Sequence, residues 1–535
     1  MTIKKKHELI LNGSSLEMSD VIDFLQADYT RVLVSEEAAE TVVHTRNKVM
    51  EWMKNQNKAV YGFNTGLGRL KDFTVKESMQ EVFQEKILHS HAAGLGVYFE
   101  DKIVKLSMLL RANVFCRGNS GVRYELVERL VKFINHDLYP AIPQVGSLGV
   151  GDLQPMAHLG LCLAGNEKGK IKYKGKVLSA PVAIEKAGIE PVKFKFATKE
   201  ALSLISGSTV LLAASVYAYF KARRLLAISD ATLALSLEAM RGEICAYDPR
   251  IQEARGMVGQ IKTAANVRYL LEKSQFLDPK CRLLFGEANP RIQDAVSFRS
   301  SPQVHGAIRE VLFYIRTVLT REINASTDNP LIFHNEDGTM DIISGGNYHG
   351  APLAYAMDML GIVLTDLGVI SERRSARFLD PTMSGGLPYN LVNSTLGLNT
   401  GFALIQANAT AIVGEMRVLA NPASIGSIPS KNNQEDHNSM GMCSARKVLQ
   451  LLNYLEEILA IELLCAAQAI DIIYQKNHKL KLGQGTRKLY TLIRKKVPFA
   501  KEDVYSRELI SKMIKILKRG EVFKLLRSME QYIIY

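Results

Sequence analysis

The sequence predicts a mainly helical protein built around a long helix bundle, with a smaller N-terminal α/β part. From Lys199 onward, apolar residues recur at helical spacing over long stretches, such as 348–378 and 444–474. Hydrophobic residues make up 47% of the 535 residues, which is enough for a large core. We therefore expect an N-terminal part over 1–200 and a helix bundle over 201–535. In such a bundle, sites form where loops and helix ends meet.

The N-terminal part is expected to mix helices with short strands. Residues 9–11 predict a strand, and Asp20 is a plausible N-cap for the helix that follows. Helices are predicted over 77–93 and 101–116. Residues 165–178 alternate around glycine, which predicts a surface hairpin.

Residues 201–220 carry no charge and are long enough to span a membrane. The run also contains several serines, a threonine and a glycine, which permit close helix packing. We therefore expect a buried core helix and no contact with a membrane.

The charge and cysteine content exclude other classes. The net charge is +13, with much of the excess after residue 476. There the basic residues alternate with Ile, Leu and Met, which predicts a solvated helical face and no nucleic-acid binding. The six cysteines are scattered without a CxxC pair, and the N-terminus lacks the apolar core of a signal peptide. Both features predict a cytoplasmic protein with reduced thiols.

A glycine-rich stretch at 143–158, PQVGSLGVGDLQPMAH, follows a helical segment and has Asp152 as its only acid. Gly146, Gly149 and Gly151 allow tight turns and close backbone approach. Spacing alone favours an ordinary glycine-rich connector.

Three further polar clusters stand out. Tyr61 opens the loop YGFNTGLG, where it either anchors the loop by packing or acts as a base, which requires a depressed pKa. His91 is either a satisfied core histidine or a ligand to substrate. The chain has no HExxH pair, so we predict no metal.

The third cluster, NNQEDHNSMG at 432–441, precedes a long apolar helix. Asn438 or Ser439 would cap that helix. So many hydrogen-bonding groups are costly to bury without partners, which favours a site over a cap alone.

These blocks, in this order, resemble the histidine and aromatic amino acid ammonia-lyases. Similar blocks are YGFNTGLG, SHAAG, IQDAVSFRSSPQVHG, INASTDNPLIF, SGGNYH, SERRSARFLDP and NPASIGSIPSKNNQEDHNSMG. The resemblance implies long central helices and a homotetramer whose active sites draw on three subunits. It also implies a carbon–nitrogen lyase acting on a small molecule.

The resemblance implies site residues as well. The catalytic residues would be Tyr61 as base and Glu435, and the substrate-binding residues would be His91, Arg299, Asn329 and Tyr348. His91 and Glu435 resemble the pair that holds the imidazole ring in the histidine enzymes. A carboxylate and an imidazole can each form a hydrogen bond with a ring N–H. The Arg299 guanidinium would pair with the substrate carboxylate.

The departures from the family pattern cluster on one function. The family signature, Gly-Ser-(Val/Leu)-Gly-Ala-Ser-Gly-Asp-Leu-x-Pro, contains the Ala-Ser-Gly triad that cyclises to an electrophilic methylidene-imidazolone. Here the loop is one residue short, and Val150 or Gly151 occupies the serine position. Ser206 and Val296 replace an Asn and a Tyr that serve the same group. We therefore expect no cofactor.

A substrate with a quaternary nitrogen does not need that electrophile, because trimethylamine leaves as a neutral molecule. The chain thus resembles the ergothioneine trimethylamine-lyases of this family, which implies an imidazole betaine as substrate. Tyr348 would offer a π face to the trimethylammonium group. Two alternatives stay open: a histidine ammonia-lyase with atypical cofactor chemistry, and a catalytically silent imidazole-binding relative.

Overall fold

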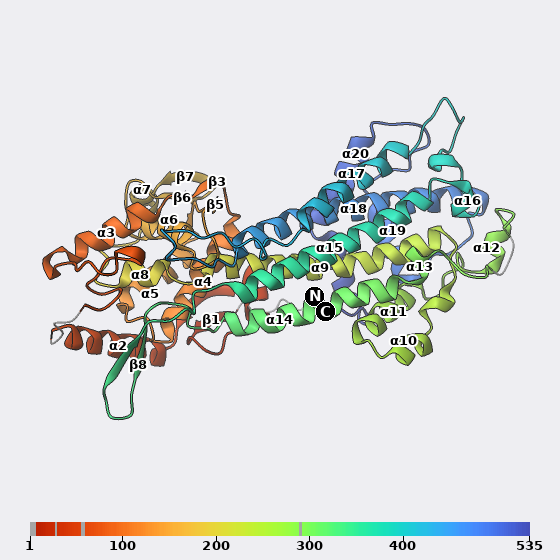
Figure 1. Cartoon of the computed structure of the whole chain (residues 1–535). Coiled ribbons are helices and arrows are strands. Elements are labelled where there is room, and N and C mark those ends of the chain that lie inside the picture. The colour runs from red at the N-terminus through yellow and green to blue at the C-terminus, as the bar shows by residue number, and fades with distance from the viewer. Residues whose placement is uncertain (1–6, 27–28, 55–58, 288–290, 535) are drawn as a thin grey trace. The chain divides into compact units, whose positions relative to one another are not determined.

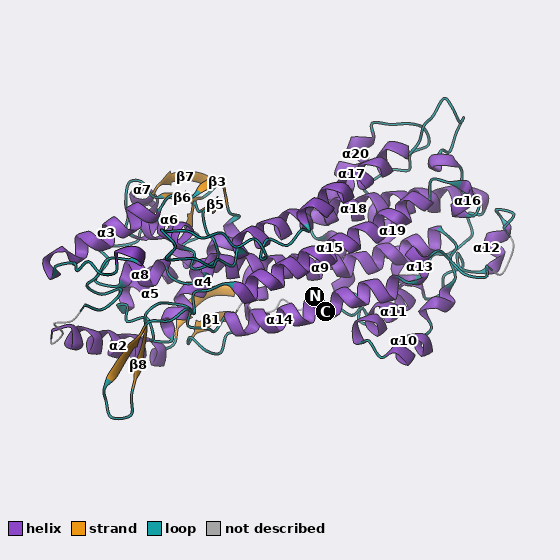
Figure 2. Cartoon of the chain, viewed as in Figure 1, coloured by secondary structure: helices purple, strands orange, loops and turns teal. Residues whose placement is uncertain are grey.

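The computed structural model describes residues 7–26, 29–54, 59–287 and 291–534, and it confirms the mainly helical fold. Helices dominate, and the strands are few and short (Figure 2). The chain forms two compact units. Unit 1 comprises Met1–Tyr217, Arg316–Asp358 and Pro422–Arg446, and unit 2 comprises Ala218–Ile315, Met359–Asn421 and Lys447–Tyr535. The division of the chain at 200/201 remains a prediction.

The described strands all lie in unit 1 and form four small sheets. β1 (His7–Leu11) pairs in parallel with β2 (Tyr29–Val34), and β3 (Leu95–Tyr98) pairs antiparallel with β5 (Pro143–Val145). β4 (Tyr139–Pro140), β6 (Lys170–Tyr173) and β7 (Lys176–Ser179) form a three-stranded sheet, and β8 (Leu331–His334) and β9 (Met340–Ile343) form a hairpin (Figure 1). The strand predicted at 9–11 and the hairpin predicted within 165–178 are confirmed.

The helices of unit 1 follow the predicted periodicity. They are α1 (Met18–Leu25), α2 (Glu36–Lys54), α3 (Gln80–His91), α4 (Asp101–Cys116), α5 (Tyr124–Asn135), α6 (Leu153–Leu163), α7 (Ala180–Lys186) and α8 (Glu200–Ile205), with 3₁₀ turns η1 (Gly68–Leu70) and η2 (Glu77–Met79). The prediction of Asp20 as N-cap is wrong. Glu17 is the N-cap, and the Asp20 carboxylate accepts the Glu17 backbone N–H at 2.9 Å. The start of α1 is a reciprocal capping box, in which Asp20 takes the third helical position and bonds back to the N-cap residue.

Four long helices have residues in both units: α9 (Thr209–Ala239), α14 (Ser301–Glu322), α15 (Ala351–Arg377) and α18 (Gly441–Lys476). The helices predicted over 348–378 and 444–474 are thus confirmed. The uncharged run at 201–220 forms α8 and the start of α9. It breaks at Gly207, whose φ of +89° favours glycine. Two helices, within Glu200–Ala239 and Ala351–Arg377, are apolar and long enough to span a membrane. The apolar window of the first is 100% buried inside the protein, as in a core helix.

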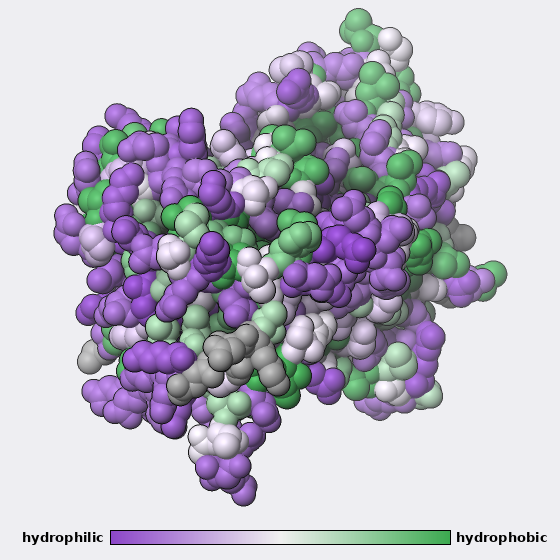
Figure 3. All heavy atoms as spheres, turned by 60° about the vertical axis from the view of Figure 1, so that its left-hand side comes forward, coloured by the Kyte–Doolittle hydropathy of each residue, from purple (hydrophilic) through white to green (hydrophobic). Residues whose placement is uncertain are grey.

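Among its described residues, unit 2 consists of helices joined by loops, with no strand. Its shorter elements are η3 (Ile244–Tyr247), α10 (Pro249–Arg255), α11 (Val258–Leu271), α12 (Pro279–Leu283), α13 (Val296–Arg299), α16 (Pro381–Ser384), η4 (Tyr389–Leu391), α17 (Ala403–Leu419), α19 (Gln484–Arg494), α20 (Ser506–Lys518) and α21 (Glu521–Arg527). Its core also holds charges. Arg374 and Glu462 are both fully buried and pair at 2.6 Å. Such a pair is tolerated only because each partner compensates the other. Figure 3 shows one face of the molecule, where hydrophilic side chains are interspersed with hydrophobic ones.

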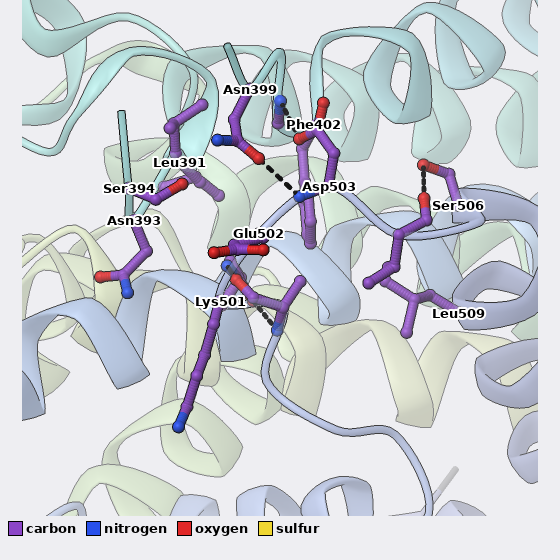
Figure 4. Close-up of a pocket in the computed structure, with 15 residues that line it drawn as sticks. Leu391, Asn393, Ser394, Asn399, Phe402, Lys501, Glu502, Asp503, Ser506 and Leu509 are labelled. Carbon is purple, nitrogen blue, oxygen red and sulfur yellow. Dashed lines mark hydrogen bonds between the residues drawn. The ribbon is translucent and has the colours of Figure 1, made fainter. Parts of the chain in front are cut away.

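Unit 2 contains a small pocket, the Asp503 pocket, with a cavity volume of about 20 Å³ (Figure 4). The polar groups of Asp503 are bonded to neighbouring loop residues. The Asp503 carboxylate accepts the backbone N–H groups of Thr400 and Gly401, each at 2.8 Å. The Asp503 N–H donates to Asn399 Oδ1 at 2.8 Å. The pocket is therefore a loop junction held by its own hydrogen bonds.

Candidate active site

A much larger pocket lies entirely within unit 1, and we call it the Tyr61 pocket. Its cavity volume is about 1000 Å³. Residues from the segments 59–72, 150–153, 344–348 and 431–435 line it with Asn329, α3 and α8, and both helices are labelled in Figure 1. Five of the six predicted site residues meet there: Tyr61, His91, Asn329, Tyr348 and Glu435.

The loop at 143–158 is held against the start of α9 by Asp152, which is fully buried. One carboxylate oxygen accepts the Ser147 hydroxyl at 2.6 Å, and the other accepts the Leu211 N–H at 2.8 Å. The Asp152 N–H donates to the Gly207 carbonyl at 2.9 Å. Burial raises the pKa of Asp152, and these hydrogen bonds oppose that rise. Asp152 therefore has a structural role that needs no prosthetic group.

Gly149 must be a glycine in this fold. Its φ is +81°, and a Cβ built on it would lie 2.1 Å from Ser439 Oγ. Its carbonyl accepts the Ser439 hydroxyl and the Gly350 N–H, both at 2.8 Å. Ser439 also accepts the N–H of Gly441, the first residue of α18, at 3.2 Å, although the helix begins one residue too late for Ser439 to be its N-cap.

The residues after Gly149 do not fit a methylidene-imidazolone. That group requires a side-chain hydroxyl to eliminate, and both Val150 and Gly151 lack one. Val150 instead lines the pocket with Ser206, and its backbone pairs with His349. The Gly151 N–H donates to the Tyr348 carbonyl at 3.1 Å. The loop therefore presents small side chains to the pocket and holds the Tyr348 segment in place.

Tyr61 stands on a loop anchored by Phe63, which is buried against Val49 and Ile332. The Tyr61 hydroxyl accepts the Gly68 N–H at 3.4 Å. The depressed pKa expected of a base is not found. Burial raises the pKa of Tyr61, and this effect outweighs the Gly68 hydrogen bond. Nearby Glu435 raises the pKa of Tyr61 further, because its negative charge disfavours the Tyr61 phenolate.

His91 is the last residue of α3, and its tautomer follows from its contacts. Nδ1 lies 2.8 Å from the Ile87 carbonyl oxygen, which can only accept a hydrogen bond. Nδ1 therefore carries the proton, and Nε2 has a lone pair to accept one. Burial lowers the pKa of His91, which favours this neutral form.

Glu435 lies in the same pocket, with its side chain 19% exposed. Lys431 Nζ is 2.6 Å from one carboxylate oxygen, and the Ser430 hydroxyl lies 3.4 Å from the other. Both charged groups act on the pKa of His91, with Lys431 lowering it and Glu435 raising it. Glu435 and His91 thus stand close together as two hydrogen-bond acceptors.

Asn329 and Tyr348 are set by neighbouring backbone groups. Asn329 Oδ1 accepts the Gly345 N–H at 2.8 Å and the Ser344 hydroxyl at 3.2 Å. Its amide N–H groups are therefore the ones suited to an anionic ligand. The Tyr348 carbonyl accepts the Ser208 hydroxyl at 2.8 Å.

Arg299 is the predicted site residue that does not line the Tyr61 pocket. It ends α13 in unit 2, and its Nε is buried without a hydrogen-bond partner in the described structure. Val296 begins the same helix and is 59% exposed. Their roles at the site remain predictions.

Sequence reasoning missed Lys431. The available signal was its position four residues before Glu435, which allows an ion pair at short range. Among the described residues, no group of three or more His, Cys, Asp or Glu could hold a metal ion.

Comparison with known proteins gives the family of this chain. Residues 16–495 match the model of the family described as aromatic amino acid lyase. The chain belongs to the aromatic amino acid lyase family. It is therefore a carbon–nitrogen lyase, as this family is. It is 40% identical to histidine ammonia-lyase from Caldanaerobacter subterraneus subsp. tengcongensis over 525 residues, which is 97% of this chain and 98% of that protein. It is 41% identical to histidine ammonia-lyase from Alkaliphilus oremlandii, covering 93% of this chain and 94% of that protein.

Two solved structures are similar to this chain. Histidine ammonia-lyase from Trypanosoma cruzi has a TM-score of 0.85 and 35% identity, covering 97% of this chain and 95% of that chain. The ergothioneine-degrading enzyme ergothionase from Treponema denticola, in complex with desmethyl-ergothioneine sulfonic acid, has a TM-score of 0.88 and 30% identity. It covers 96% of this chain and 99% of that chain.

Proposed function

We propose that this lyase eliminates trimethylamine from an imidazole betaine, ergothioneine or a close relative, and gives thiourocanate or the corresponding urocanate. One observation carries the proposal. The serine that would form the electrophile is absent at Val150 and Gly151, while Tyr61, His91 and Glu435 still line one pocket.

The chemistry explains why these two facts belong together. A free amine is a poor leaving group, so an ammonia-lyase needs an electrophile to activate the nitrogen. A trimethylammonium nitrogen already carries four bonds and a positive charge. The base removes a proton from the CH₂ beside the ring, the new double bond forms, and the C–N electron pair leaves with neutral trimethylamine. No electrophile takes part in these steps.

The pocket supplies groups for each step. Tyr61 takes the proton. His91 and Glu435 position the ring and stabilise the charge that develops on it. Its raised pKa makes Tyr61 a strong base once it is ionised, at the cost of a small ionised fraction at neutral pH. Val150 and Ser206 leave room for the trimethylammonium group, and the nearby Tyr348 ring offers it a π face.

The substrate carboxylate requires donors. Asn329 provides amide N–H groups within the pocket. Arg299 would provide a bidentate guanidinium from another subunit of a homotetramer, consistent with its absence from the pocket of its own chain. A cytoplasmic location fits the scattered free cysteines.

The comparisons support two candidates. Ergothionase from Treponema denticola, at 30% identity, acts on the proposed substrate. The histidine ammonia-lyases are more similar in sequence, at about 40% identity. That higher identity favours a second candidate, a histidine ammonia-lyase with atypical cofactor chemistry. The missing serine is the reason we rank it second.

One assay separates the candidates. The protein is incubated with histidine, hercynine or ergothioneine, and ammonia and trimethylamine are quantified. We expect trimethylamine from a betaine and no ammonia from histidine. Ammonia from histidine, with an intact mass showing loss of water, would establish the second candidate. Absence of both products with binding retained would indicate a catalytically silent relative.

A further inference from the structure

The segment that carries Glu435 into the Tyr61 pocket is a left-handed turn. Three successive non-glycine residues, Lys431, Asn432 and Asn433, have φ values of 51°, 56° and 61°. The turn is closed by the Ser430 N–H, which donates to the Glu435 carbonyl at 2.9 Å. L-residues disfavour this conformation, and such strain concentrates at functional sites.

The turn brings an ammonium group and a carboxylate together inside the pocket. Lys431 Nζ lies 2.6 Å from Glu435 Oε1, and both residues line the cavity. The Lys431 side chain is 37% exposed, so it remains accessible to a ligand. Within the described part of the chain, Glu435 Oε2 is bonded only by the Ser430 hydroxyl at 3.4 Å, and it keeps capacity to accept another hydrogen bond.

The neighbouring His91 presents a second acceptor. Its Nδ1–H is committed to the Ile87 carbonyl, which leaves Nε2 to accept. A ring held between His91 and Glu435 should therefore donate twice. A neutral imidazole has one N–H and one acceptor nitrogen, whereas an imidazole-2-thione has two N–H groups flanking its C=S carbon.

We infer that Lys431 is a specificity-determining residue that binds a sulfur atom on the ring carbon between the two nitrogens. When Glu435 accepts one ring N–H, the substituent on the adjacent carbon lies beside that N–H. An ammonium bonded to the same carboxylate faces this substituent. Sulfur offers lone pairs there, whereas an unsubstituted ring offers a C–H that cannot accept from Lys431.

The inference rests on the proposed function for the reaction and narrows its substrate class to 2-thioimidazole betaines. As the CH₂ beside the ring loses its proton, negative charge spreads through the ring to sulfur. Lys431 then stabilises that charge where it develops. Sulfur recognition thus contributes to both binding and rate.

Ring recognition is testable by binding alone. Dissociation constants of 2-thiourocanate and urocanate are measured by calorimetry for the unmodified protein, Lys431→Met, Lys431→Arg and Lys86→Met. Lys86 lines the same pocket and has no contact with Glu435 in the described structure, so it is a matched control for loss of one positive charge. Circular dichroism checks the fold of each variant.

We expect the unmodified protein to favour the thio ligand by about 30-fold, the effect of one charge-assisted hydrogen bond. Lys431→Met should lose most of that ratio by weakening only the thio ligand. Lys431→Arg should keep part of it, and Lys86→Met should leave the ratio unchanged. Equal binding of both ligands by the unmodified protein, or an unchanged ratio in Lys431→Met, overturns the inference. Failure of the proposed function shows separately, as no trimethylamine from either betaine.

Discussion

The Tyr61 pocket and the Asp503 pocket use their polar groups in opposite ways. In the Asp503 pocket, the carboxylate accepts two backbone N–H groups and the Asp503 N–H is itself bonded. In the Tyr61 pocket, the fold commits one side of each polar group and leaves the other for a ligand. His91 gives Nδ1–H to a carbonyl and keeps Nε2, and Asn329 uses its oxygen and keeps its amide hydrogens. The difference teaches that a binding site is recognised by polar groups that keep an unused donor or acceptor. Polar groups whose donors and acceptors are all bonded indicate a structural role.

The largest test of this contrast is removal of the Tyr61 hydroxyl. Tyr61→Phe should lower kcat by about 10²–10⁴-fold, the contribution of a positioned general base. Binding of a product such as thiourocanate should change little, because the ring is held by other residues. Stopped-flow or absorbance assays of the elimination, with calorimetry for binding, measure the two effects. A variant that keeps its rate would place the base elsewhere.

The next largest effect is expected from substitution of Asp152, which should lower the stability of the folded protein. Asp152→Ala leaves the buried Leu211 N–H and the Ser147 hydroxyl without their acceptor, which costs about 2–4 kcal/mol. The thermal unfolding midpoint should fall. Ser147→Ala removes only one of these hydrogen bonds, so it should lower the midpoint less. Equal midpoints for Asp152→Ala and the unmodified protein would contradict the structural role.

These two positions show what the sequence allowed us to predict. The long helices and most of the pocket followed from residue patterns and from the family resemblance. The raised pKa of Tyr61 did not, because it depends on burial by segments distant in sequence. The hydrogen bond from Leu211 to Asp152 joins residues 59 apart, and no local pattern indicates it. Arg299 could be matched to the family by sequence, but it does not line the Tyr61 pocket, and its role remains a proposal.

The pH dependence gives an effect of intermediate size. Tyr61 acts as a base only when ionised, and its pKa lies above the ordinary value of about 10. Its ionised fraction therefore grows tenfold per pH unit below that pKa. We expect log kcat/KM to rise with a slope of about +1 between pH 7 and 9. Protonation of His91 should matter only below about pH 6.5, because its pKa is lowered. A flat profile would argue against Tyr61.

The smallest effect is expected in the Asp503 pocket. Asp503→Asn keeps one acceptor oxygen, so the free energy of unfolding should fall by about 1 kcal/mol or less. The rate of elimination should not change, because none of the predicted site residues lines this pocket. Chemical denaturation and the trimethylamine assay measure the two quantities. A large loss of activity would show that this region takes part in the reaction.

The Asp152 contacts have a consequence for how this lineage can change its chemistry. In this loop, the residues that hold the backbone are separate from the positions at which relatives build their electrophile. The Ser147 and Asp152 side chains and the Gly149 carbonyl hold the loop, whereas Val150 and Gly151 contribute through their backbone. A cofactor can therefore be gained or abandoned without remaking the scaffold. Folding of this loop and formation of the prosthetic group are therefore separable, both in evolution and in protein design.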